Sequence, residues 1–123
     1  MVCAMTRAKD AVGAYGERVA VRYLIDQGMV LLDRNWRCGS GELDAVLRDG
    51  DTVVFAEVKT RRGGRFGPPA EAVVPAKVHR LRRLAALWLA QSRFQPREVR
   101  FDVVSVLARS TGPATVEHLR GAF

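Results

Sequence analysis

The sequence has little cysteine and no long apolar run. Its 123 residues include two cysteines, Cys3 and Cys38, which are too few for a disulfide framework and form no metal-binding cluster. We therefore expect reduced thiols, no zinc site and a cytoplasmic location. No segment reaches the roughly 18 apolar residues of a membrane span, and residues 1–10 lack the apolar stretch of a signal peptide. These absences argue against secreted disulfide scaffolds and membrane-spanning proteins.

Acidic residues are also scarce relative to basic ones. Thirteen Asp and Glu stand against twenty Lys and Arg, which gives a net charge of +7. Such an excess favours an anionic polymer as partner, although ribosomal and membrane-surface proteins share it. A hydrophobic content of 48% with 27% charged residues is ordinary for one globular domain. We expect a flexible tail over residues 1–10 and a single domain over residues 11–123.

Hydrophobic periodicity predicts an α/β fold. Apolar residues recur at helical spacing over residues 11–27 and 75–92, and alternate over residues 99–107. Residues 29–37, apolar and then mixed, and residues 115–119 are read as further strands. An Asp-Gly step between two apolar runs predicts a hairpin within residues 41–61. Gly16 interrupts the apolar stripe of the first helix, where it would let another segment approach closely. The order αβββαβ, with a short last strand, predicts a mixed central sheet flanked by helices.

The hairpin determines which side chains share a face. We take Asp49-Gly50 as a two-residue type I′ turn, which needs positive φ at both positions. That turn pairs Val46 with Val53, Asp44 with Phe55, and Glu42 with Glu57. By alternation one face carries Glu42, Asp44, Val46, Val53, Phe55, Glu57 and Lys59, and the other carries Leu43, Ala45, Leu47, Val54, Ala56 and Val58. A three-residue loop with a bulge would instead separate Asp44 and Glu57.

Three carboxylates, those of Glu42, Asp44 and Glu57, are thereby placed close together on one face. Like charges opposite one another on a sheet are destabilising, and Lys59 supplies only one positive charge. A divalent cation would complete the balance, and Mg²⁺ is typically held by one or two carboxylates together with substrate phosphate. The pattern is equally compatible with a rim of solvated charges at the end of a sheet.

Basic residues gather after the hairpin and on the second helix. Arg61, Arg62 and Arg65 begin a loop rich in Gly and Pro, where guanidinium groups are well placed for phosphates. One side of the second helix is basic, and its Lys77 and Arg80 are candidates for nucleic-acid contact. Both segments are also typical of solvated surface. His79 and His118 have no partner at ligand spacing, so neither is proposed to bind a metal.

Four stretches resemble one family. They are Tyr15-Gly16-Glu17, Ser40-Gly41-Glu42-Leu43-Asp44, Phe55-Ala56-Glu57-Val58-Lys59-Thr60-Arg61 and Phe66-Gly67-Pro68-Pro69-Ala70-Glu71-Ala72-Val73. The sequence thus resembles the YraN family of small bacterial proteins, similar in fold to restriction-endonuclease-like nucleases with a PD-(D/E)xK site and to archaeal Holliday-junction resolvases. The resemblance makes Asp44 the motif aspartate, Glu57-Val58-Lys59 the E-x-K element, and Glu17 the acidic residue of the first helix. Leu43 stands where the motif name has proline.

The resemblance implies a nuclease that hydrolyses phosphodiester bonds, with DNA as the expected partner. The expected catalytic residues are Glu17, Asp44, Glu57 and Lys59, and the expected ligands of Mg²⁺ (or Mn²⁺) are Asp44, Glu57, the Val58 carbonyl and, in support, Glu42. A branched DNA substrate would require a homodimer, because two strands are cut at two sites. Two alternatives stay open: a non-catalytic nucleic-acid-binding module with the same fold, and a structural partner of ribosomal or repair proteins.

Overall fold

A mixed five-stranded sheet, with the order β1-β2-β3-β4-β5, lies at the centre of the structure. The structure is a computed structural model that describes residues 11–62 and 74–123, so the predicted tail and Arg65 lie outside it. Its elements are α1 (Ala11–Asp26), β1 (Val30–Cys38), β2 (Gly41–Asp49), β3 (Thr52–Arg62), α2 (Pro75–Gln91), β4 (Glu98–Ala108) and β5 (Thr115–Leu119). The predicted order is confirmed. No helix in this described part is long and apolar enough to cross a membrane.

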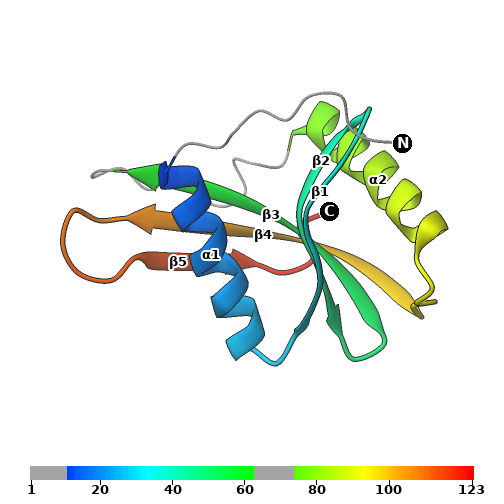
Figure 1. Cartoon of the computed structure of the whole chain (residues 1–123), viewed down its shortest axis with the longest axis horizontal. Coiled ribbons are helices and arrows are strands. Elements are labelled where there is room, and N and C mark those ends of the chain that lie inside the picture. Colours follow the sequence, from blue (N-terminus) through cyan, green and yellow to red (C-terminus); the bar gives the residue numbers. More distant parts are fainter. Residues whose placement is uncertain (1–10, 63–73) are drawn as a thin grey trace.

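The two helices cover opposite faces of the sheet (Figure 1). All neighbouring strands are antiparallel except β3 and β4, which are parallel and are connected through α2. Alternation along the strands supplies one apolar cluster to each helix. The cluster under α1 includes Ala45, Leu47, Val54 and Ala56, and the cluster under α2 includes Val46, Val53, Phe55 and Trp88. The sheet is therefore buried on both faces around β2 and β3.

The β2–β3 turn differs from the predicted one. Its loop residues are Gly50 and Asp51, because Asp49 pairs with Thr52. Gly50 has a φ of 64°, and no other residue of this loop has a positive φ. A positive φ at the first loop position alone indicates a type II′ turn rather than the expected type I′. The predicted pairing of Asp44 with Phe55 and of Glu42 with Glu57 is therefore wrong by two residues, because the loop starts one residue later.

A shift of two residues preserves the faces of most side chains, because the side-chain period of a strand is two. Val46 now lies opposite Phe55, and Ala45 lies opposite Ala56. Leu43 and Glu42 depart from the predicted faces. Leu43 packs in the cluster under α2 instead of lying with Ala45 and Leu47 under α1. Glu42 is bonded through Asn35 to Glu17 of α1, whereas Glu57 pairs with Lys77 of α2, so the predicted grouping of Glu42 with Glu57 on one face is wrong. The reason is that the β2–β3 ladder ends at Ala45, while β2 continues to pair with β1 as far as Gly41.

Gly16 allows α1 to cross closely over β3. A Cβ atom added there would lie 1.9 Å from Oγ1 of Thr60 and 2.7 Å from its Cβ. The side chain of threonine is short and β-branched, so it cannot swing out of the way. The predicted close approach at Gly16 is thus made by the side chain of Thr60, and it holds the neighbouring Glu17 against the sheet.

Replacing Gly16 with alanine is expected to destabilise the fold by about 1–3 kcal/mol, because the added methyl group overpacks this crossing. Thermal and urea unfolding would measure the change. The matched control is Gly39→Ala, where an added Cβ meets nothing within 4 Å, and we expect a change there within about 0.5 kcal/mol. Equal stability of the two variants would contradict this account of the crossing.

Candidate functional site

β2 and β3 separate at the end of the hairpin away from its turn. The last pair in their ladder is Ala45↔Ala56. At the next residue of β2, a side chain takes the place of the backbone in bonding to β3. Oδ2 of Asp44 accepts a hydrogen bond from the backbone N–H of Val58 at 2.9 Å. Continuation of the register brings Asp44 next to Glu57. Asp44 is therefore held against the E-x-K segment at the point where the two strands part.

The backbone of Val58 also contributes to this point. The N–H and C=O of a strand residue point to the same side of the strand. Because the N–H of Val58 points to Asp44, its carbonyl oxygen faces the same gap. Asp44, Glu57 and Val58 are all partly buried. The Asp44 carboxylate and the backbone of Val58 thus meet where the β2–β3 ladder ends, with Glu57 as the preceding residue of β3.

Two lysines reach this region from different elements. Lys77, in the first turn of α2, places its Nζ 2.5 Å from Oε2 of Glu57, with side chains 21% and 13% exposed. Glu57 alternates with Val53 and Phe55, which face α2, so the ion pair lies on the α2 side of the sheet. Lys59, two residues further, is half-buried and forms no ion pair with any residue that the structure describes.

Glu17 and Glu42 meet at a residue that was not predicted, Asn35. The Asn35 amide, with its nitrogen toward the carboxylates, donates to Oε1 of Glu17 at 2.9 Å and to Oε2 of Glu42 at 3.1 Å. Arg37 also contacts Oε2 of Glu42, at 3.3 Å. Glu17 itself is 7% exposed. The first-helix carboxylate is thereby joined to the start of β2 through an amide on β1.

Asn35 has the only positive φ, 53°, among the non-glycine residues that the structure describes. The pairs on either side of it show that Asn35 lies across from Asp44, in the neighbouring strand. Asn tolerates the left-handed region better than most residues, but such a conformation still costs about 1–3 kcal/mol and gathers at functional sites. An asparagine inside an apolar strand pattern was the one sequence signal that could have indicated this residue.

The predicted nucleic-acid contacts are spread over two elements. Arg61 and Arg62 end β3, and Arg62 is exposed and lines a cavity of about 920 Å³ with Tyr15 and Arg109. Arg80 is exposed on α2. Of the predicted contacts, the structure brings Lys77 to Glu57.

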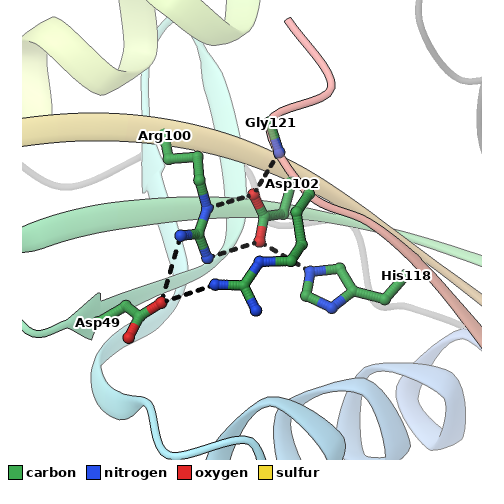
Figure 2. Close-up of polar contacts among 6 residues, drawn as sticks. Asp49, Arg100, Asp102, His118 and Gly121 are labelled. Atoms are coloured by element: carbon green, nitrogen blue, oxygen red, sulfur yellow. Dashed lines mark hydrogen bonds and ion pairs between the residues drawn. The ribbon is translucent and has the colours of Figure 1, made fainter.

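A second polar cluster lies near the other end of the hairpin, around the fully buried Asp102 of β4 (Figure 2). Its carboxylate accepts from Arg100 at 2.9 and 3.1 Å, from the N–H of Gly121 at 3.0 Å and from Nε2 of His118 at 2.7 Å. A carboxylate only accepts, so Nε2 carries the proton. His118, which showed no partner in the sequence, is thus paired with Asp102 by the fold.

This cluster ties separate elements together. Arg100 and Arg120 both contact Oδ2 of Asp49, at 3.2 and 3.1 Å, so the end of β2 is joined to β4 and to the residues after β5. Burial alone would raise the pKa of Asp102, but hydrogen bonds from His118, Arg100 and Gly121 outweigh it and lower the pKa from 3.8 to about 2. Asp102 is therefore ionised at neutral pH and has a structural role.

The carboxylates near Asp44 do not form a complete metal cage. Among residues 11–62 and 74–123, no three His, Cys, Asp or Glu side chains converge closely enough to hold an ion. Two carboxylates and a backbone carbonyl are nevertheless hard oxygen ligands, and Mg²⁺ usually takes one or two carboxylates and completes its shell with water and substrate phosphate. Asp44, Glu57 and Val58 fit a magnesium ion that is shared with a phosphate, and they do not fit an ion held by protein alone.

The chain is similar to many bacterial proteins over nearly its whole length. The sequence model of a family described as "Uncharacterised protein family UPF0102" matches residues 16–106. A UPF0102 protein of Frankia alni is 62% identical, over 95% of this chain and 98% of the relative. One of Beutenbergia cavernae is 62% identical over 94% of this chain and 98% of the relative, and one of Kineococcus radiotolerans is 60% identical over 94% and 95%.

Proposed function

The chain belongs to the UPF0102 family. From the geometry of its site we propose that it is a metal-dependent nuclease that hydrolyses phosphodiester bonds of DNA. The observation that carries the proposal is the hydrogen bond from Val58 to Asp44 where β2 and β3 part. It holds Asp44 against the segment Glu57-Val58-Lys59, which supports the site that the PD-(D/E)xK resemblance implies. The sheet order and the α1 position of Glu17 are consistent with the same resemblance.

Each residue has a role that its position supports. Asp44, Glu57 and the Val58 carbonyl would hold Mg²⁺ or Mn²⁺, which polarises the scissile phosphate and acidifies a water molecule when it is bound. Lys59, without an ion pair among the described residues, is available to donate to the phosphate as negative charge develops. Glu17 and Glu42, joined by Asn35, orient the β1 side of the site.

The excess of basic residues would supply affinity for the DNA backbone. Arg61, Arg62, Arg65 and Arg80 would contact phosphates. Lys77, which is paired with Glu57 in the structure, would be free to contact a phosphate if Glu57 held the metal. A branched substrate is cut by a homodimer, because two strands require two sites. We place this activity in the cytoplasm, where both thiols stay reduced.

One observation favours a second candidate, a DNA-binding module without catalysis. The ion pair of Lys77 with Glu57 already neutralises a carboxylate that the nuclease needs for its metal. If that pair persists in the presence of metal and DNA, Glu57 is a structural anchor for α2, and the basic surface acts in binding alone.

The test is cleavage by the purified chain. Plasmid, single-stranded and four-way-junction DNA are each incubated with Mg²⁺, with Mn²⁺ and with EDTA. We expect cleavage in either metal and none in EDTA, because the proposed ligands act only through the ion. Binding without cleavage in either metal would favour the second candidate. Neither binding nor cleavage would contradict both, and would leave docking to ribosomal or repair proteins as the use of the basic surface.

A further inference from the structure

A second cavity, of about 390 Å³, lies between α1 and β1 beside the proposed active site. It is lined by Ala14, Glu17, Arg18, Arg34, Asn35 and Arg37. Three of these six residues are arginines, and none of them was among the predicted nucleic-acid contacts. Arg18 and Arg34 are exposed at the surface, whereas Glu17 is buried. The cavity therefore has a basic rim above a polar floor.

The charges of this cavity match a monoanion. The lining residues, taken together with Glu42, which is bound to both Arg37 and Asn35, comprise three arginines and two carboxylates. These groups carry one net positive charge. An internal phosphodiester carries one negative charge and would neutralise it, whereas a terminal phosphate carries nearly two and would leave excess negative charge beside Glu17. The balance favours a phosphate within a strand.

The floor of the cavity is fixed before any ligand binds. Asn35 is held in its left-handed conformation between Glu17 and Glu42, and Arg37 is oriented by Glu42. The backbone N–H of Arg34 donates to Oδ1 of Asp33 at 2.9 Å, and Oδ2 of Asp33 accepts from Trp88. Donors on such an ordered backbone lose less conformational entropy when they bind a phosphate.

The cavity also lies next to the proposed active site, on its β1 side. Asn35 lies across from Asp44, so the cavity adjoins the carboxylates from the β1 edge. Lys77 approaches the same carboxylates from α2, on the opposite face of the sheet to α1. A strand that passes Asp44 would meet basic side chains both before and after it.

We infer that this cavity binds one internal phosphodiester of the nucleic-acid strand, next to the phosphate that is cut. This inference rests on the proposed function and adds to it a second contact point, with Arg18 and Arg34 as the donors that are not already paired with Glu42. Guanidinium groups bind phosphate through two parallel hydrogen bonds, which would fix the register of the strand at the site.

The experiment measures DNA binding as a function of salt in EDTA, so that no strand is cut. Fluorescence anisotropy with duplex and single-stranded oligonucleotides compares the wild-type chain with Arg18→Ala, Arg34→Ala and the double variant. Losing one phosphate contact should reduce the slope of log K against log salt by about 0.9 for duplex and about 0.7 for single-stranded DNA. We expect that reduction in the double variant, with an unchanged melting temperature.

The matched control is Arg22→Ala. Arg22 lies one turn after Arg18 on the same helix, and its side chain is 80% exposed. Among the residues that the structure describes, it is paired only with Asp26. Its removal changes the net charge by one unit, as much as either single variant does, but removes no residue of the cavity, so the slope should stay at the wild-type value. Equal slopes for the double variant and Arg22→Ala would overturn the inference, since the effect would then be one of general charge.

Two further outcomes separate this inference from the proposed function. If a 5′-phosphate on the oligonucleotide strengthens wild-type binding and the double variant loses that gain, the cavity holds a strand end, which overturns the internal position. A wild-type chain that binds DNA but does not cut it contradicts the proposed nuclease activity. The salt slopes of the variants still test whether the cavity binds a phosphate. A chain that binds no DNA overturns both.

Discussion

Asp44→Asn should lower DNA cleavage by at least about 10²-fold while leaving the fold intact. The asparagine side-chain oxygen can still accept the hydrogen bond from the N–H of Val58, which Oδ2 of Asp44 accepts at 2.9 Å. The negative charge that would hold the metal is lost, however, and charge stabilisation at a reacting centre is usually worth about 10²–10³ in rate. Cleavage kinetics in Mg²⁺ and thermal unfolding measure the two effects separately.

The control for this variant is Asp26→Asn at the exposed end of α1, which should cut at the wild-type rate. Lys59→Ala provides an independent arm, since it removes the proposed phosphate donor and leaves the carboxylates in place. We expect Lys59→Ala to lower the cleavage rate by a similar factor. If Asp44→Asn and Lys59→Ala each kept the full cleavage rate, either a contaminant cuts the DNA or the site has been placed at the wrong residues.

The sequence was sufficient for the elements and for the two faces of the paired part of the hairpin. Helical and alternating periodicities are local properties, so each element was found within a residue or two of its observed bounds. The faces of the paired part, from Ala45 to Ala56, remained correct although the turn was misplaced, because an error of two residues leaves alternation unchanged. Asp44 and Glu57 therefore came together by a register that differed from the expected one.

The sequence could not show where the β2–β3 ladder ends, because that depends on packing against both helices. Leu43 turns under α2 and Asp44 bonds to the backbone of Val58 only because pairing stops at Ala45. The left-handed Asn35 and its bonds to Glu17 and Glu42 likewise need three elements to meet. These contacts are tertiary, and no spacing along the chain encodes them.

The two ends of the hairpin thus have different roles. At the turn, Asp49 is bound by Arg100 and Arg120, which connects β2 to β4 and to the residues after β5. At the other end the strands part and carboxylates face a gap. A site that collects like charges opposes folding, so we expect the cluster around Asp102 at the closed end to offset that cost.

Asp102→Asn is expected to destabilise the fold by about 3 kcal/mol, because removing one charge from a buried ion pair leaves its partners uncompensated. Asp102 is fully buried, and an amide nitrogen in place of one oxygen would face the donors of Arg100 or His118. Urea unfolding at neutral pH measures the difference. Asp26→Asn, at an exposed carboxylate, should change stability by less than about 0.5 kcal/mol and serves again as control.

Acid provides an independent test of the same residue. The pKa of Asp102 is lowered from 3.8 to about 2 in the folded chain, so below pH 5 the unfolded state takes up its proton first. Stability from this group is present above pH 3.8 and is lost as the pH falls through 2, and it amounts to about 2 kcal/mol. The stability gap between wild type and Asp102→Asn should therefore narrow between pH 5 and pH 2. A constant gap would mean that Asp102 acts through its shape alone and that its charge contributes nothing to holding β4, β5 and the hairpin together.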